Sequence, residues 1–247
     1  PVKKNTKLKL KLTGTNNILN MDEISSEEEL DQALERMLDE VKACEYFIKE
    51  THEFTMILPK EYYDPGSYSK WVRVGWALKN TCSQLDYRDN RLFLTFLKFS
   101  SQSSEFTYAD VPGLWDQWSN KFHSNPDGLT KKSIMYWAKQ DADQGAYKEI
   151  RENTVDFFMN EAIETQTEFD LATVLYQLFK DRFICVSISK NCWYEFRDHR
   201  WVENDSGNSL RMSISKDLHS VFVNKLLTLM EDMRTSSMTQ WEVARNF

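Results

Sequence analysis

The sequence predicts a mainly α-helical protein: a small helical bundle followed by a helix–β-hairpin–helix unit. Gly and Pro are scarce, at seven and five of 247 residues. Apolar residues recur at helical spacing through most of the chain. One stretch, Asn191 to Glu203, instead alternates aromatic with charged residues, which is typical of short, half-buried strands. With 13% aromatic residues, the composition is that of a chain with a substantial core.

The first part of the chain combines a basic leader with an acidic helix. Residues 1–20 are irregular, and we interpret them as a linker with a short strand at 7–12. From Ser25 to Glu50 we predict one amphipathic helix, because Ser side chains cap backbone N–H groups and acids favour the positive end of a helix. Two prolines then bound a loop at 59–69. The leader contains five lysines and no acid: Lys3, Lys4, Lys7, Lys9 and Lys11.

Four helices are predicted next, at 67–81, 91–100, 111–122 and 129–141. Thr130 is the expected N-cap of the last of them. Gly75 lies inside the first helix, where Gly is less favourable than Ala by about 1 kcal/mol. We therefore expect the backbone of another segment to approach it closely.

The second unit begins with a connecting helix at 144–165 and a helix at 169–180. A strand at 184–189 follows, and then a hairpin in which Trp193–Phe196 pairs with His199–Val202 around a turn at Arg197–Asp198. A long helix at 207–234 completes a winged-helix-like order. The predicted domains are 1–20 (basic linker), 21–64 (helix and loop), 65–145 (helical domain) and 146–247 (helix–hairpin–helix domain, incomplete at its end).

Composition and motifs exclude several functional classes. A net charge of −7 argues against a nucleic-acid module that works by bulk electrostatics alone. The four cysteines are scattered, which is typical of reduced thiols in an intracellular protein. No apolar stretch is long enough to span a membrane, and no signal peptide is present. The first residue is not Met, and we interpret the chain as a fragment of a longer protein.

Catalytic signatures are also missing from the sequence. There is no G-x-x-x-x-G-K-[ST] phosphate loop, no predicted strand with the closely spaced acids that hold two metal ions, and no Cys–His ligand spacing. We therefore predict no catalytic residues, no metal site and no cofactor in this chain.

The second unit carries a resemblance to a viral replication protein. The pattern DLATVLYQLFKDRFICVSI…WYEFRDHRW…SGNSLRMSIS resembles the amino-terminal flank of the helicase module in primase-helicases of nucleocytoplasmic large DNA viruses. The poxvirus-type primase-helicase is the best-known member of this group.

The helical bundle carries a second resemblance. The pattern WVRVGWAL…FLKFSSQSSEF…LWDQW…GLTKKSIMYWAK resembles the primase C-terminal domain of the second type, which follows an archaeo-eukaryotic primase core. The matching residues are Trp71, Val74, Gly75, Ala77, Leu78, Phe99, Ser100, Ser103, Trp115, Trp118, Gly128, Leu129, Tyr136, Trp137 and Ala138.

Together the two resemblances imply a non-catalytic connector in DNA replication. It would link a primase core to a superfamily-three AAA+ helicase and help to position single-stranded or forked DNA or to organise a homo-hexamer. The parent protein would be a primase and an ATP hydrolase that uses ATP and Mg²⁺, in the host cell cytoplasm or nucleus. Its partners would be the adjacent primase and helicase domains of the same chain, with no membrane involved.

Basic residues at helix starts and at the hairpin are the candidate DNA contacts. Arg197, His199 and Arg200 could contact phosphates from a wing-like hairpin, or form a solvated turn paired with Asp198 or Glu195. Four further cations are placed by the sequence at helix starts, where an anionic partner would offset their unfavourable interaction with the helix dipole: Lys131, Lys132, Arg211 and Lys216. For the last helix, Asp205 could supply that negative charge equally well.

Tryptophans are the second class of candidates. Trp76 and Trp118 lie on the flanks of their helical stripes, so we expect them to be exposed and able to stack on bases. The alternative is that the tryptophans fill the cores of the helical units.

Two other functions are compatible with the sequence. The chain could be a docking module, whose acidic helix and exposed aromatics bind subunits or replication partners without touching DNA. It could also be a hydrolase built on Asp198 and His199. Adjacent strand residues point to opposite faces, which ranks the hydrolase last.

Overall fold

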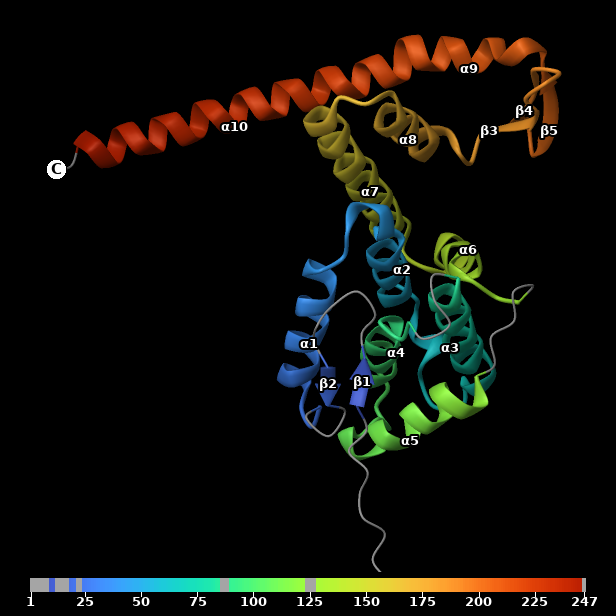
Figure 1. Cartoon of the computed structure of the whole chain (residues 1–247), viewed down its shortest axis with the longest axis vertical. Helices are drawn as coiled ribbons and strands as arrows, with labels where there is room; N and C mark the ends of the chain where they lie inside the picture. The colour runs from blue at the N-terminus through green and yellow to red at the C-terminus, as the bar shows by residue number, and fades with distance from the viewer. Residues whose placement is uncertain (1–8, 12–17, 21–23, 85–88, 123–127, 246–247) are drawn as a thin grey trace, which may run out of the picture. The chain divides into compact units, whose positions relative to one another are not determined.

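The chain folds into two compact units, residues 1–152 and 153–247, in a computed structural model. The structure describes residues 9–11, 18–20, 24–84, 89–122 and 128–245 (Figure 1). Most of the leader, including Lys3, Lys4 and Lys7, lies outside the described residues. The described part is mainly α-helical with a small antiparallel sheet, which confirms the predicted fold class.

The first unit is a helical bundle preceded by a short pair of strands. Strands β1 and β2 pair antiparallel. The elements of this unit are β1 (Lys9–Lys11), β2 (Ile18–Asn20), α1 (Glu27–Asp39), η2 (Ala43–Glu45), α2 (Phe47–Met56), η3 (Lys60–Tyr62), α3 (Tyr68–Ser83), α4 (Leu92–Ser101), η4 (Tyr108–Asp110), α5 (Val111–Asp116), the π-helical η5 (Gln117–Lys121), α6 (Lys131–Asp141) and the first turns of α7 (Gln144–Thr165).

Several local predictions are confirmed. Ser26 caps α1 by accepting a hydrogen bond from the backbone N–H of Glu29, at 3.3 Å. Thr130 caps α6 in a capping box with Ser133. The single helix predicted from Ser25 to Glu50 is wrong, because α1 ends at Asp39 and a 3₁₀ turn separates it from α2.

Helix α4 is the centre of the bundle. It packs against α1, α2 and α3, as Figure 1 shows, and its sequence LFLTFLKFSS is apolar around nearly its whole circumference. A helix of this composition is stable only when it is covered on all sides. Its fully buried residues include Leu92, Phe93, Phe96, Leu97 and Phe99.

Gly75 in α3 lies against aromatic rings of the same core. A Cβ at this position would meet the side chains of Phe122 and Phe96. We expected another backbone to approach this glycine; that expectation is wrong, because the close neighbours are ring atoms.

Polar groups at the start of α4 are paired. Arg91 donates to both carboxylate oxygens of Glu45, at 2.9 and 2.8 Å, and also to Asp89. The hydrogen bond from Arg91 holds the pKa of Glu45 below its usual value. Asn90 Oδ1 accepts from Lys79 Nζ at 3.0 Å and from Trp118 Nε1 at 2.8 Å. These polar groups around the start of α4 are therefore matched, as a stable core requires.

The second unit combines helices with a three-stranded sheet of order β3-β4-β5. This is the predicted helix–hairpin–helix order, with β3 as a third antiparallel strand. Its elements are the last turns of α7, α8 (Glu168–Phe179), β3 (Phe183–Ser187), β4 (Cys192–Arg197), β5 (Arg200–Asn204), η6 (Asp205–Gly207), α9 (Asn208–Ser213), the π-helical η7 (Ile214–Leu218) and α10 (His219–Arg245).

Two small cores hold this unit together. Met159, Val174 and Leu218 join α7 to α8 and η7. Phe179, Phe183 and Leu210 join α8 to the sheet and α9. Beyond these cores α10 continues with large apolar side chains exposed to solvent, namely Val223, Leu226, Leu227, Leu229, Met230 and Met233. The helix predicted at 207–234 thus ends later than expected, at Arg245.

Over the residues that the structure places, no helix combines the length and apolar character that a bilayer crossing requires.

Candidate nucleic-acid interface

The hairpin between β4 and β5 turns at Asp198 and His199. Both residues have a positive φ, 50° and 60°, which is the geometry of a type I′ turn. This corrects the predicted turn at Arg197–Asp198: Arg197 is still in the ladder and pairs with Arg200. The reason for ranking the hydrolase last is also wrong, because Asp198 and His199 are turn residues and not neighbours on a strand.

The tip of this hairpin is basic and exposed. Arg197, His199 and Arg200 are all solvent-exposed. In the described part of the chain, no salt bridge joins either arginine to a carboxylate. The structure thus brings three of the predicted DNA contacts together at the tip of one hairpin, with Asp198 as the acid among them.

Glu195 ties the hairpin to the helices. Its carboxylate accepts from Arg182 at 2.7 Å and from Ser209 Oγ at 2.7 Å. Burial acts to raise its pKa, but these hydrogen bonds and the charges of Arg182 and Arg197 hold the pKa of Glu195 below its usual value. Glu195 therefore stays ionised and keeps the base of the hairpin in place.

One face of the sheet presents exposed aromatics. Phe196 and Trp201 are cross-strand partners with ring centroids 5.3 Å apart, and they are 41% and 47% exposed. Ile184 and Tyr194 are partners on the same face. Exposed rings can stack on unpaired bases. Phe196 is not among the predicted DNA contacts, although its pairing with Trp201 puts both rings on one face of the sheet.

Arg211 and Lys216 are exposed on the helix that follows the sheet. Arg211 is in the first turns of α9, near the predicted place. Lys216 is not at a helix start, because α9, η7 and α10 run on without a break and Lys216 lies in the π-helical segment. The prediction that Lys216 interacts unfavourably with a helix dipole is therefore wrong.

The lysines of the first unit differ in exposure. Lys131 is half-buried: its backbone N–H donates to Thr81 Oγ1 at 2.8 Å, and its Nζ lies 4.1 Å from the ring centroid of Phe47. Lys132 is exposed at the start of α6. Of this pair, only Lys132 therefore has a solvent-exposed side chain.

The two tryptophan predictions have opposite outcomes. Trp76 is 41% exposed, as expected. Trp118 is 0% exposed and packs against Phe93 and Phe96, so its predicted exposure is wrong. Val111, seven residues earlier and therefore on the same face of the helix, is buried as well, so the helical spacing itself directs Trp118 towards the core.

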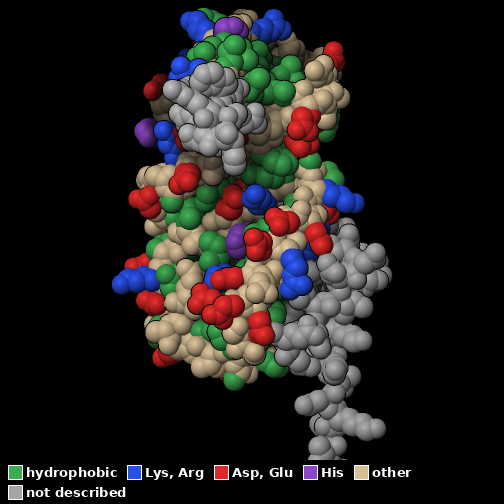
Figure 2. Space-filling view, turned by 90° about the vertical axis from the view of Figure 1, so that its left-hand side faces the viewer, with side chains coloured by type: hydrophobic (Ala, Val, Ile, Leu, Met, Phe, Trp, Pro, Cys, Tyr) green, Lys and Arg blue, Asp and Glu red, His purple; other side chains and the backbone are tan. Residues whose placement is uncertain are grey.

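Acidic residues dominate another surface of the first unit. Figure 2 shows carboxylates gathered over the face that carries α1, where Glu28, Glu35 and Asp39 are exposed. Such a surface repels phosphates. Among the described residues, no group of three or more His, Cys, Asp or Glu side chains is arranged to hold a metal ion.

Comparisons with known proteins support the resemblances. Residues 53–138 match the family model described as Primase C terminal 2 (PriCT-2). The chain is 31% identical over 186 residues to a protein named as a putative helicase in Acanthamoeba polyphaga mimivirus, which covers 72% of this chain and 18% of the relative. It is also 31% identical over 153 residues to a putative primase of African swine fever virus, covering 59% of this chain and 15% of the relative.

A third relative matches a similar share of the chain. A protein named as a putative helicase in Frog virus 3 is 25% identical over 172 residues, covering 69% of this chain and 16% of the relative. The chain thus spans less than a fifth of the length of these relatives. Residues 53–138 form a primase C terminal 2 domain, in a chain homologous to the primase and helicase proteins of nucleocytoplasmic large DNA viruses.

Proposed function

We propose that this chain is a non-catalytic connector of a viral replicative primase-helicase, and that its second unit guides single-stranded DNA between the two activities. The observation that carries the proposal is the basic hairpin tip beside an exposed aromatic pair. Arg197 and Arg200 can neutralise backbone phosphates, while Phe196 and Trp201 present rings for stacking. Catalysis, with its ATP and magnesium, belongs in this proposal to other parts of the parent protein.

The family relationship supports the same role. The first unit contains the primase C terminal 2 domain, and the relatives carry both primase and helicase names. On this proposal the chain lies between a primase and a helicase and contacts the unpaired template strand. The overall negative charge restricts binding to local basic patches, so we expect weak affinity that falls steeply with salt.

A fluorescence-anisotropy titration of the complete 247-residue chain with single-stranded and forked DNA tests the proposal. Replacing Arg197 and Arg200 together by Ala should reduce the magnitude of the slope of log K against log salt concentration by about 1.4. This corresponds to roughly 0.7 for each lost phosphate contact. Trp201→Ala should weaken binding by about tenfold through lost stacking.

The matched control is the double variant Lys139→Ala/Lys190→Ala, which removes two exposed positive charges elsewhere. Its salt dependence and affinity should stay close to those of the parent chain. Equal weakening in both double variants, or no binding at low salt, would contradict the DNA-guiding role.

A second candidate function is supported by α10. Its exposed apolar side chains, Leu226 and Met230 among them, are the kind of surface that packs against another subunit or a replication partner. On this alternative the chain is a docking module that organises an oligomer without touching DNA. Sedimentation velocity distinguishes the two functions. Docking is favoured if the chain forms an oligomer, if the double variant Leu226→Ser/Met230→Ser dissociates that oligomer, and if the chain does not bind DNA.

A further inference from the structure

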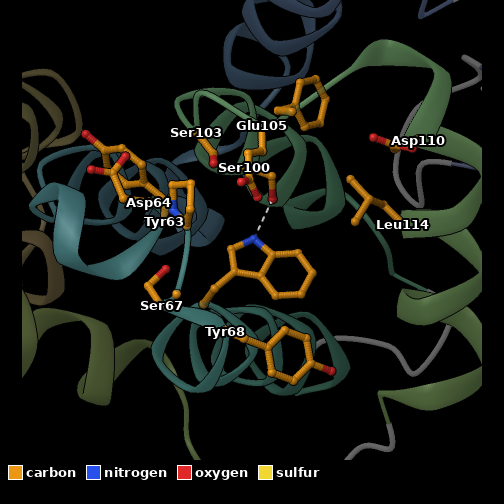
Figure 3. A pocket seen from close by; sticks show the side chains of 13 residues that line it. Tyr63, Asp64, Ser67, Tyr68, Ser100, Ser103, Glu105, Asp110 and Leu114 are labelled. Atoms are coloured by element: carbon orange, nitrogen blue, oxygen red, sulfur yellow. Dashed lines mark hydrogen bonds between the residues drawn. The ribbon is translucent and has the colours of Figure 1, made fainter.

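A pocket in the first unit is lined by none of the candidate DNA contacts. It opens between the loop before α3, the end of α4 and the η4–α5 segment, and its volume is about 310 Å³ (Figure 3). All of its walls come from residues 63–114, so it is formed within one compact unit.

Aromatic rings form one wall of the pocket. The indole N–H of Trp71 donates to Ser100 Oγ at 2.9 Å, the dashed line in Figure 3, which fixes the orientation of the ring. Tyr68 lies beside it, with ring centroids 5.8 Å apart, and is 66% exposed. Phe106 adds a third ring to the lining. Ring faces of this kind attract cations through their quadrupoles.

Carboxylates complete the lining. Asp64, Glu105 and Asp110 contribute three negative charges, and among the described lining residues there is no Lys, Arg or His. Asp110 accepts a hydrogen bond from Thr107 Oγ1 at 2.8 Å, which holds its carboxylate at the rim. A phosphate would be repelled here, whereas a cation would be attracted both by the rings and by the acids.

We propose that this pocket binds an arginine side chain presented by a basic segment of a partner protein. A guanidinium matches both features of the lining, because it stacks on aromatic faces and donates two parallel hydrogen bonds to a carboxylate. An ammonium group lacks the planar fork, so lysine fits the same pocket less well. The first unit is thus a protein-docking unit, independent of DNA contacts in the second.

The test uses a fluorescein-labelled glycine-rich peptide with two arginines, titrated with the complete chain, beside the same peptide with citrulline in place of arginine. Citrulline keeps the shape and loses the charge. The arginine peptide should bind about tenfold more tightly, as the loss of charge-assisted hydrogen bonds predicts. A lysine peptide should lie between the two.

Variants separate the pocket from general attraction to an acidic protein. The triple variant Asp64→Asn/Glu105→Gln/Asp110→Asn should weaken the arginine peptide by about tenfold. Tyr68→Ala should weaken it by about threefold through the lost cation–π contact. The control triple Glu28→Gln/Glu35→Gln/Asp39→Asn removes the same charge from exposed positions on α1 and should change affinity by less than about twofold.

The outcomes are distinct. Selective loss in the pocket variants, with unchanged circular dichroism, supports the site. Equal weakening by both triples, equal binding of the citrulline peptide, or no binding of the arginine peptide overturns it. A shift of the Trp71 indole N–H resonance on peptide addition, assigned with Trp71→Phe, provides a readout that does not depend on affinity.

Discussion

Gly75 in α3 faces the ring of Phe122: a Cβ at position 75 would lie 2.8 Å from Cζ of Phe122. A second ring, that of Phe96, would be 3.0 Å away. Both phenylalanines are buried and part of the core around α4. The close approach of α3 to this aromatic cluster therefore depends on the absence of a side chain at one position.

Gly75→Ala should destabilise the first unit by about 1–3 kcal/mol, because overpacking of the rings outweighs the gain in helix propensity. Chemical denaturation measures the change. Gly113→Ala is the control, since a Cβ at position 113 in α5 meets nothing within 4 Å. It should be neutral or stabilising by up to about 1 kcal/mol. A stable Gly75→Ala protein would show that the rings can move aside.

Arg91→Met should destabilise the first unit by about 3–5 kcal/mol, because it leaves Asp89, which is 1% exposed, as an unpaired buried charge. Lys148→Met breaks the exposed pair with Glu152 and should change stability by less than about 0.5 kcal/mol. Similar effects of the two substitutions in urea denaturation would refute a structural role for the Arg91 network.

His52 should make the first unit sensitive to acid. Burial, together with the charges of Lys98 and Lys49, lowers its pKa from 6.5 to about 4. Its Nδ1 also lies 3.0 Å from Thr95 Oγ1. The unfolded chain binds more protons between these two pKa values, so stability falls as the pH drops from 6.5 towards 4, by about 3 kcal/mol at most.

The matching experiment compares His52→Gln with His219→Gln over this pH range. Glutamine at position 52 does not titrate and should flatten the pH dependence of the unfolding free energy. His219 is exposed, and its replacement should leave the dependence unchanged. An unchanged slope in His52→Gln would exclude His52 as the source.

His199→Gly should stabilise the hairpin by about 1 kcal/mol, because Gly adopts the positive φ of this turn position without strain. The melting temperature of the second unit reports the change. Lys190→Gly, at a turn residue without a positive φ, should instead lower stability slightly. If both substitutions lower the melting temperature of the second unit, the turn is not type I′ in solution.

Local chemistry accounts for what the sequence predicted well. The connecting helix was predicted at 144–165, and α7 has these bounds. The Thr130 cap and the start of α6 follow from one side chain and its neighbours, so they need no knowledge of distant residues. The alternation in WYEFRDHRW located the hairpin for the same reason.

The errors arose where distant contacts or unusual backbone geometry decide. Trp118 lies on the same helix face as the buried Val111, and its indole N–H donates to Asn90 Oδ1, 28 residues away in sequence. The hairpin turn lacks the Asn-Gly pair that marks type I′ turns, so its position was misjudged by one residue. The interruption after α1 contains neither Gly nor Pro, and Glu45 within it is held by Arg91, 46 residues away in sequence.

The π-helical segment η7 has a consequence for evolution and engineering. A π-helical turn holds about one residue more than an α-helical turn, so the loss of one residue within Ile214–Leu218 can be absorbed by conversion of this segment to an ordinary α-helix. Deleting Ser215 would therefore leave Leu226 and Met230 facing nearly the same way, whereas a deletion in a regular α-helix would rotate everything after it by about 100°. The direction of the exposed apolar side chains of α10 is thus insensitive to the loss of a single codon in this segment.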